Sequence, residues 1–267
     1  MNTILMTMTF AAFVLAMGIR YATQAFVAAM MGDGSPARDR RLTLNPARQL
    51  APLGTMIALI SAFPAQGFLA TSAIPIGLGW GKPIRPNSLR LSAGPNTGLV
   101  IIGLSGIVVN LLAGSLAALL LALLPIHAID LGVATCANQF HGAPLQSCLS
   151  FWQPAWALRL EQFVFVFASV NLLIGLLNII PLFPLDGYHI LFAFLPTNAA
   201  VGYRNNEFVQ EMVLVGLLFF LPFLLQIIGA PQTLNPFYWL QVFSYSIIDL
   251  FTAPHYVGSL APIFINL

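Results

Sequence analysis

Charged residues are scarce in this sequence: they make up 7% of its 267 residues, where about 25% is usual for a soluble domain. Hydrophobic residues account for 58% of the chain. This composition excludes an ordinary soluble domain and predicts an integral membrane protein, with room for about five or six spanning helices of roughly 20 residues each. The net charge is only +2 and no basic tract with interleaved aromatic residues occurs, so we expect no nucleic-acid partner.

Cysteine and histidine are rare as well. The two cysteines, Cys136 and Cys148, lie in a stretch from 125 to 158 that contains no Lys or Arg. A cysteine pair in an exported loop is a candidate disulfide, and two free thiols are the alternative. All four histidines follow residue 126, so the first apolar segments lack this common metal ligand.

The few charged residues divide the chain into apolar segments. Basic loops at 32–50 and 82–96 both belong in the cytoplasm by the positive-inside rule. The apolar segment between them must then enter and leave the membrane on the same side, as a re-entrant hairpin or as two short helices. We expect the loop at 197–210 to be cytoplasmic and the loop at 125–160 to lie outside the cytoplasmic membrane. The predicted membrane segments are 3–31, 51–79, 97–124, 161–180, 212–229 and 237–253.

One carboxylate, Asp186, stands in a break within an apolar run. Three residues that interrupt helices surround it: Pro181, Pro184 and Gly187. A carboxylate flanked by membrane-length apolar segments is costly to bury, so it marks a functional site or a paired charge. Because prolines stop helices, we expect Asp186 on irregular backbone that faces protein or a polar cavity. The alternative is a loop at the membrane surface.

Short motifs in a fixed order connect these segments to a known family. They are Gly32-Asp33, Arg41-Leu-Thr-Leu-Asn-Pro46, Pro52-Leu-Gly-Thr55, Gly79-Trp-Gly-Lys-Pro83, Ser105-Gly106 through Asn110, and Asn178-Ile-Ile-Pro-Leu-Phe-Pro-Leu-Asp-Gly187. In this order and spacing the set resembles the site-2 protease family of intramembrane zinc metalloproteases, in its compact bacterial form. The resemblance implies an all-α, membrane-embedded fold. We expect one domain over residues 1–267, with a family-like core at about 15–225 and an additional membrane segment at 237–253.

The family's chemistry requires His-Glu-x-x-His on the first helix, where two histidines one turn apart bind zinc and the glutamate is the general base. The aspartate of Leu-Asp-Gly, here Asp186, supplies the third protein ligand. The matching positions on the first helix are Arg20, Tyr21 and Gln24. Arginine does not lose its proton to bind a metal, tyrosine is a poor base at neutral pH, and one carboxylate is not a catalytic zinc site. We therefore expect a pseudoprotease with no catalytic residues and no bound zinc.

Arg20 offers a substitute for the missing metal. In the family these positions converge on one ion, so we predict that Arg20 is the cationic partner of Asp186 in a buried ion pair, with Gln24 adding hydrogen bonds. A buried Arg or Asp alone would be very costly, whereas the pair offsets both charges. The alternative is that Arg20 extends along its helix to the membrane surface.

The expected function is non-enzymatic: a scaffold or accessory subunit that contacts the lipid bilayer and other membrane protein subunits. A different class of function is an ion or small-molecule pathway lined by Arg20, Gln24 and Asp186. Asp249, in the last apolar segment, is either a partner contact or a helix-end residue in water.

Two enzymatic alternatives use other residues. An active metalloprotease would need relocated zinc ligands, beginning with His189, which lies three residues after Asp186. A rhomboid-like serine protease would use Ser105, in Gly103-Leu-Ser-Gly106, with His189 or His255 as its base. Helix packing is the better interpretation of that glycine-containing motif.

Overall fold

The computed structural model describes residues 3–62, 77–123 and 156–252, and every regular element in these ranges is a helix. Cys136, Cys148 and His255 lie outside the described residues, so the predicted disulfide stays a prediction. The all-α, membrane-embedded fold predicted from the sequence is confirmed. Within these described ranges, four helical stretches are long and apolar enough to cross a membrane: Thr3–Met30, Pro95–Leu123, Arg159–Leu177 and Glu207–Leu225.

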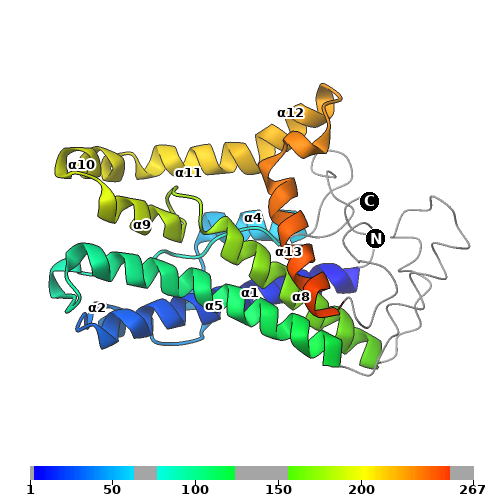
Figure 1. Cartoon of the computed structure of the whole chain (residues 1–267), viewed down its shortest axis with the longest axis horizontal. Coiled ribbons are helices and arrows are strands. Elements are labelled where there is room, and N and C mark those ends of the chain that lie inside the picture. The colour runs from blue at the N-terminus through cyan, green and yellow to red at the C-terminus, as the bar shows by residue number, and fades with distance from the viewer. Residues whose placement is uncertain (1–2, 63–76, 124–155, 253–267) are drawn as a thin grey trace, which may run out of the picture.

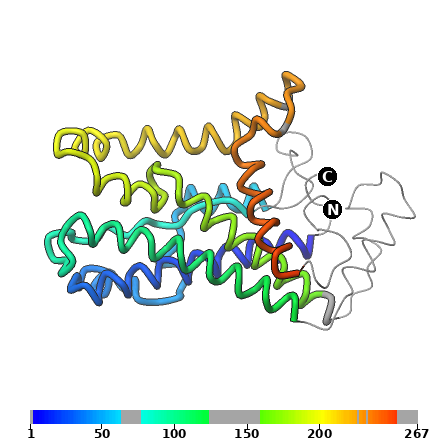
Figure 2. Tube along the Cα trace, in the orientation of Figure 1, coloured from blue at the N-terminus to red at the C-terminus, as the bar shows by residue number. Residues whose placement is uncertain are grey.

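Three of these helices form the centre of the molecule: α1 (Thr3–Met30), α5 (Pro95–Leu123) and α8 (Trp156–Leu177). They pack against one another and run side by side along its long axis (Figures 1 and 2). Glycines allow the close approach of α5 and α8, because a Cβ atom at Gly114 would lie 2.6 Å from Leu172 Cγ and one at Gly175 would lie 2.8 Å from Leu111 Cδ2. Small residues at such interfaces are the usual basis of tight helix packing in membranes.

The segment between the two basic loops begins and ends on the same side of the protein. Helix α4 (Pro52–Ala62) has only 11 residues, too few to span a bilayer core of about 30 Å. Leu50 and Gly81 form an isolated antiparallel bridge, and the Lys82 N–H donates to the Gln49 carbonyl at 2.7 Å. The two ends of the segment therefore meet. This agrees with the predicted re-entrant segment, whose turn falls outside the described residues.

The C-terminal half adds a second row of helices along the opposite edge. Short helices α9 (Asp186–Phe194) and α10 (Thr197–Asn205) lead into α11 (Glu207–Val215), the π-helical turn η2 (Gly216–Phe220) and α12 (Leu221–Ile227). After the 3₁₀ turn η3 (Gln232–Leu234), helix α13 (Pro236–Thr252) crosses back to pack on α5 and α8 (Figure 1). Pro222 follows the π-helical turn and has no N–H to donate to the preceding turn, which accounts for the irregularity there.

Parts of the predicted loops are helical. The range 197–210 holds α10 and the start of α11, and the basic loops hold α2 (Ser35–Arg38), α3 (Pro46–Gln49) and the 3₁₀ turn η1 (Ser88–Arg90). The expected outer loop also ends earlier than predicted, because α8 starts at Trp156. These boundaries were wrong because polarity marks exposure to water, and exposed polar residues form helices as readily as loops.

Candidate functional site

Asp186 is the first residue of α9, directly after the break in the apolar run. Asn178, at the end of α8, holds this break in shape: its carbonyl accepts from the Gly187 N–H at 2.7 Å and its Oδ1 accepts from the Asp186 N–H at 3.3 Å. Gly187 is required here, since a Cβ atom would lie 2.4 Å from the carbonyl oxygens of Ile179 and Ile180. The break is therefore an ordered loop that presents Asp186 to the protein interior.

Arg20, on α1, binds this carboxylate through two nitrogens. Its Nη2 lies 2.7 Å from Asp186 Oδ1, and its Nε donates to Oδ2 at 2.9 Å. The two side chains are 0% and 4% exposed, so the pair is buried. The Nε contact is a hydrogen bond between charged groups, which is stronger than one between neutral groups, and the Nη2 contact adds a close ion pair. The structure thus places Arg20 against Asp186, inside the protein.

Gln24 lies one turn after Arg20 and contacts the same carboxylate. Its Nε2 donates to Asp186 Oδ1 at 2.7 Å and is 3.4 Å from the Ile102 carbonyl. Residues four apart share a helix face, which explains why both side chains reach one acceptor. Both oxygens of Asp186 are therefore bound by side chains of α1.

Gly106, on α5, makes the space for this cluster. A Cβ atom there would lie 2.3 Å from both Asp186 Oδ2 and Gln24 Nε2. The sequence predicts helix packing for Gly103-Leu-Ser-Gly106, and the spacing of the two glycines indicates a close neighbour without identifying it as Asp186. Ser105 donates its hydroxyl to the Ile102 carbonyl at 2.7 Å, within its own helix.

Tyr21 lies between Arg20 and Gln24 on α1 and is the third first-helix position that the sequence comparison singled out. It is fully buried, and a Cβ atom on Gly81 would lie 2.2 Å from its Cε2, so the ring lies directly under the extended backbone of the re-entrant segment. The guanidinium carbons of Arg20 and Arg41 lie 4.8 and 5.7 Å from the ring centroid, at cation–π distance. Tyr21, which the sequence comparison matched to the general-base position of the site-2 protease motif, is therefore an aromatic packing residue in this structure.

The donors at this site do not fit a zinc ion. Zinc sites use thiolate, imidazole and carboxylate ligands, and no group of three such residues comes together anywhere in the described ranges. Asp186 is the one such ligand among the four motif positions, and its oxygens are bound by Arg20 and Gln24. A guanidinium is a permanent cation with no acceptor to offer a metal.

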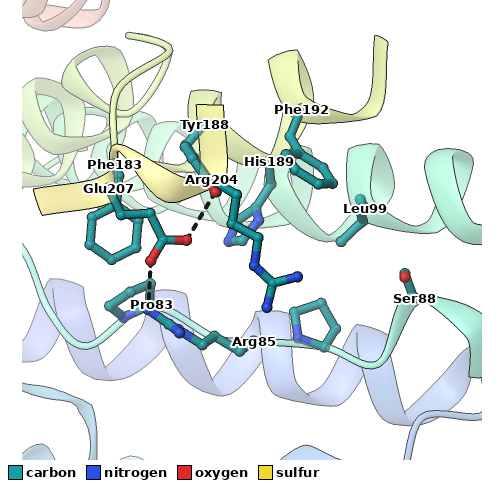
Figure 3. Close-up of a pocket in the computed structure, with 11 residues that line it drawn as sticks. Pro83, Arg85, Ser88, Leu99, Phe183, Tyr188, His189, Phe192, Arg204 and Glu207 are labelled. Carbon is teal, nitrogen blue, oxygen red and sulfur yellow. Dashed lines mark hydrogen bonds and ion pairs between the residues drawn. The ribbon is translucent and has the colours of Figure 1, made fainter. Parts of the chain in front are cut away.

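His189, the first ligand of the relocated-metal alternative, lies in a neighbouring pocket of about 110 Å³ (Figure 3). There the Tyr188 hydroxyl donates to Glu207 Oε1 at 2.9 Å, and Arg85 Nη2 donates to Glu207 Oε2 at 2.7 Å. Burial and the bond to Glu207 raise the pKa of Tyr188, which keeps it a neutral donor. The polar groups of this pocket therefore join the chain after the re-entrant segment to α9 and α11.

Asp249, the carboxylate in the last apolar segment, is half-buried on α13.

Comparison with known proteins connects the fold and this site to one family. The family model of peptidase family M50 matches residues 48–223, a range that includes Asp186 and begins after Arg20, Tyr21 and Gln24. The chain is also similar to a protein of Bacillus subtilis (strain 168) named "Putative zinc metalloprotease YwhC", with 27% identity over 183 residues, which is 68% of this chain and 67% of that protein. No solved structure gives a significant match to this chain.

Proposed function

This chain belongs to peptidase family M50, the site-2 protease family, and from that premise we propose that it is a catalytically inactive member of the family. One observation carries the proposal: Asp186, the carboxylate that would bind zinc, is held instead by Arg20 and Gln24. The general base is absent from the same helix, because Tyr21 stands in its place. Without ligands and base, a water molecule cannot be activated for peptide hydrolysis.

Electrostatics supports this proposal. Two unit charges 4 Å apart interact by about 4 kcal/mol at the effective dielectric constant that suits protein sites, so a divalent ion beside Arg20 would be repelled by about 8 kcal/mol. Zinc binding at Asp186 would also have to break the contacts made by Arg20 and Gln24. The ion pair therefore takes over the metal's structural task of joining α1 to the start of α9, and it supplies no Lewis acid.

We further propose that the protein acts as a scaffold or accessory subunit of a larger membrane complex. Its described residues lie mostly in apolar helices, so contacts within the bilayer are the main surface it offers. Helices α11 to α12 expose large apolar side chains along their length, including Phe208, Met212, Phe220 and Leu224, a face that suits lipid or a partner helix. The basic loops place the Arg20 side of the protein in the cytoplasm.

The decisive experiment is elemental analysis for zinc on the gently solubilised protein, with the co-purifying chains identified in the same sample. We expect no zinc in the wild type and stoichiometric partner chains. A matched control restores the motif by Arg20→His, Tyr21→Glu and Gln24→His, which should allow the same fold to bind about one zinc per chain. About one zinc in the wild type would overturn the proposal and favour an active metalloprotease with relocated ligands.

A further inference from the structure

A second and larger cavity is lined by residues of the first basic loop, by the start of α4 and by the chain from Lys82 to Arg85. Its volume is about 860 Å³, within the range of roughly 300–1,000 Å³ typical of small-molecule sites. Four basic side chains line it, against one carboxylate, Asp39: they are Arg41, Arg48, Lys82 and Arg85. We call it the basic cavity.

The basic residues of this cavity have different tasks. Arg41 is buried and donates to the backbone carbonyls of Arg48 and Lys82, so it fixes the cavity wall. Arg85 is paired with Glu207. Arg48 and Lys82 have exposed side chains, and neither side chain is hydrogen-bonded or ion-paired to another described residue. Two cations are therefore held over one cavity with their charge available to a ligand.

The length of α1 favours a position of the basic cavity near a membrane surface. Arg41 lies over the ring of Tyr21, and Tyr21 is about 27 Å along α1 from Thr3 at 1.5 Å per residue. The hydrocarbon core of a bilayer is about 30 Å thick. If α1 enters the bilayer near its first turn, the cavity falls at the opposite boundary, where lipid headgroups lie.

An apolar surface continues from the same cavity. Its wall includes Ala51 and Pro52, where α4 begins. Further along α4, the side chains of Met56, Leu59 and Ile60 are 53%, 45% and 37% exposed. A ligand with an anionic head in the cavity can therefore extend its hydrocarbon chains along α4.

We propose that the basic cavity binds the phosphate headgroup of an anionic phospholipid from the cytoplasmic leaflet. Arg48 and Lys82 contact the phosphate, the wall held by Arg41 shapes the site, and α4 carries the acyl chains. The cytoplasmic leaflet is rich in anionic lipids and attracts basic segments. The positive charge and volume of the cavity, its position near a membrane surface and the apolar surface beside it favour a lipid over a soluble acidic segment of a protein.

The test is a lipid titration of the full-length protein in detergent, followed by native mass spectrometry. Phosphatidylglycerol is compared with phosphatidylcholine, and inorganic phosphate and a polyglutamate peptide serve as competitors. The double variant Arg48→Gln/Lys82→Gln removes the two available charges and keeps the backbone carbonyls that Arg41 uses. The matched control Arg38→Gln/Arg40→Gln removes two exposed charges from the same loop that do not line the cavity.

We expect wild type and control to bind phosphatidylglycerol in preference to phosphatidylcholine. The cavity variant should bind phosphatidylglycerol about thirtyfold more weakly, since each basic residue near an anionic lipid contributes about a fivefold gain. Equal binding of the two lipids, or equal weakening by the control variant, would overturn the proposal. Displacement of the lipid by inorganic phosphate at matching concentration would assign the site to free phosphate, and displacement by the peptide would assign it to an acidic protein segment; either result also overturns it.

Discussion

The ion pair between Arg20 and Asp186 can be tested by removing one partner at a time. Arg20→Met keeps a long apolar side chain but leaves a buried carboxylate with Gln24 as its only side-chain donor. Removal of one partner of a buried ion pair costs about 3–5 kcal/mol, because the remaining charge is left without compensation in a site that excludes water. Both side chains are almost fully buried, so little solvent screening reduces this cost. We expect Arg20→Met to lower the free energy of unfolding by that amount.

The second half of the test is the double variant. Asp186→Asn alone leaves a buried guanidinium and should be similarly destabilising. In Arg20→Met/Asp186→Asn neither position carries a charge, so the loss should be smaller than the sum of the two single losses by up to about 3 kcal/mol. Reversible unfolding in mixed micelles, followed by circular dichroism and tryptophan fluorescence, measures all four proteins of the cycle. Arg38→Met, at an exposed position, is the control and should stay within about 0.5 kcal/mol of wild type.

Two results would refute the reasoning. If Arg20→Met costs less than about 1 kcal/mol, which is the value for an exposed ion pair, then the pair is not the buried cross-link that the structure indicates. If the two single losses add within about 0.5 kcal/mol, as independent sites do, the side chains do not interact energetically despite the 2.7 Å contact between them.

Two further predictions concern the space around this pair and the loop beyond α1. Gly106→Ala should destabilise the protein by about 1–3 kcal/mol, because its methyl group would lie 2.3 Å from Asp186 Oδ2. Gly202, on α10, has open space around it, so Gly202→Ala should instead stabilise the protein by about 0.5–1 kcal/mol in the same unfolding assay. For Asp33, burial alone raises the pKa, but the hydrogen bonds that it accepts outweigh burial, and the net pKa lies below its usual value. The Asp33 carboxylate therefore binds a proton more readily in the unfolded chain than in the folded protein. Its contribution to stability is complete above the unfolded pKa and is lost as the pH falls through the lower folded pKa. Acid unfolding curves should show this loss in the wild type and not in Asp33→Asn, and identical curves would contradict it.

The membrane segments were predictable because hydropathy and length are local properties of the chain. A run of about 20 apolar residues has few alternatives to a spanning helix. The re-entrant segment was predictable for a different reason: two basic loops on one side leave no room for a single crossing between them. The polar stretch at 197–210 misled us because a helix and a loop can have the same polarity, and helix α10 there buries no residue that periodicity could reveal.

The contact between Arg20 and Asp186 was predictable only through the family motifs. Nothing in the local sequence joins two residues that are 166 positions apart. The role of Gly106, the bonds of Asn178 to the break, and the burial of Tyr21 under Gly81 could not be predicted, since each depends on the distance between elements that pack only in the folded chain. A glycine in a membrane helix indicates a close neighbour without identifying it.

In the proposed inactive site the residues around Asp186 depend on one another. The break that presents Asp186 is held by Asn178 and Gly187, so the carboxylate stays buried whether or not a metal is there. A buried carboxylate needs a cation, and Arg20 supplies it permanently. If Arg20 alone reverted to histidine, Asp186 would lose its fixed positive partner without gaining a metal site, because two ligands do not hold a catalytic zinc. Under the proposed loss of zinc binding, a protease site would therefore require several substitutions together, and an intermediate that has lost Arg20 but lacks the other ligands carries the cost of an unpaired buried charge.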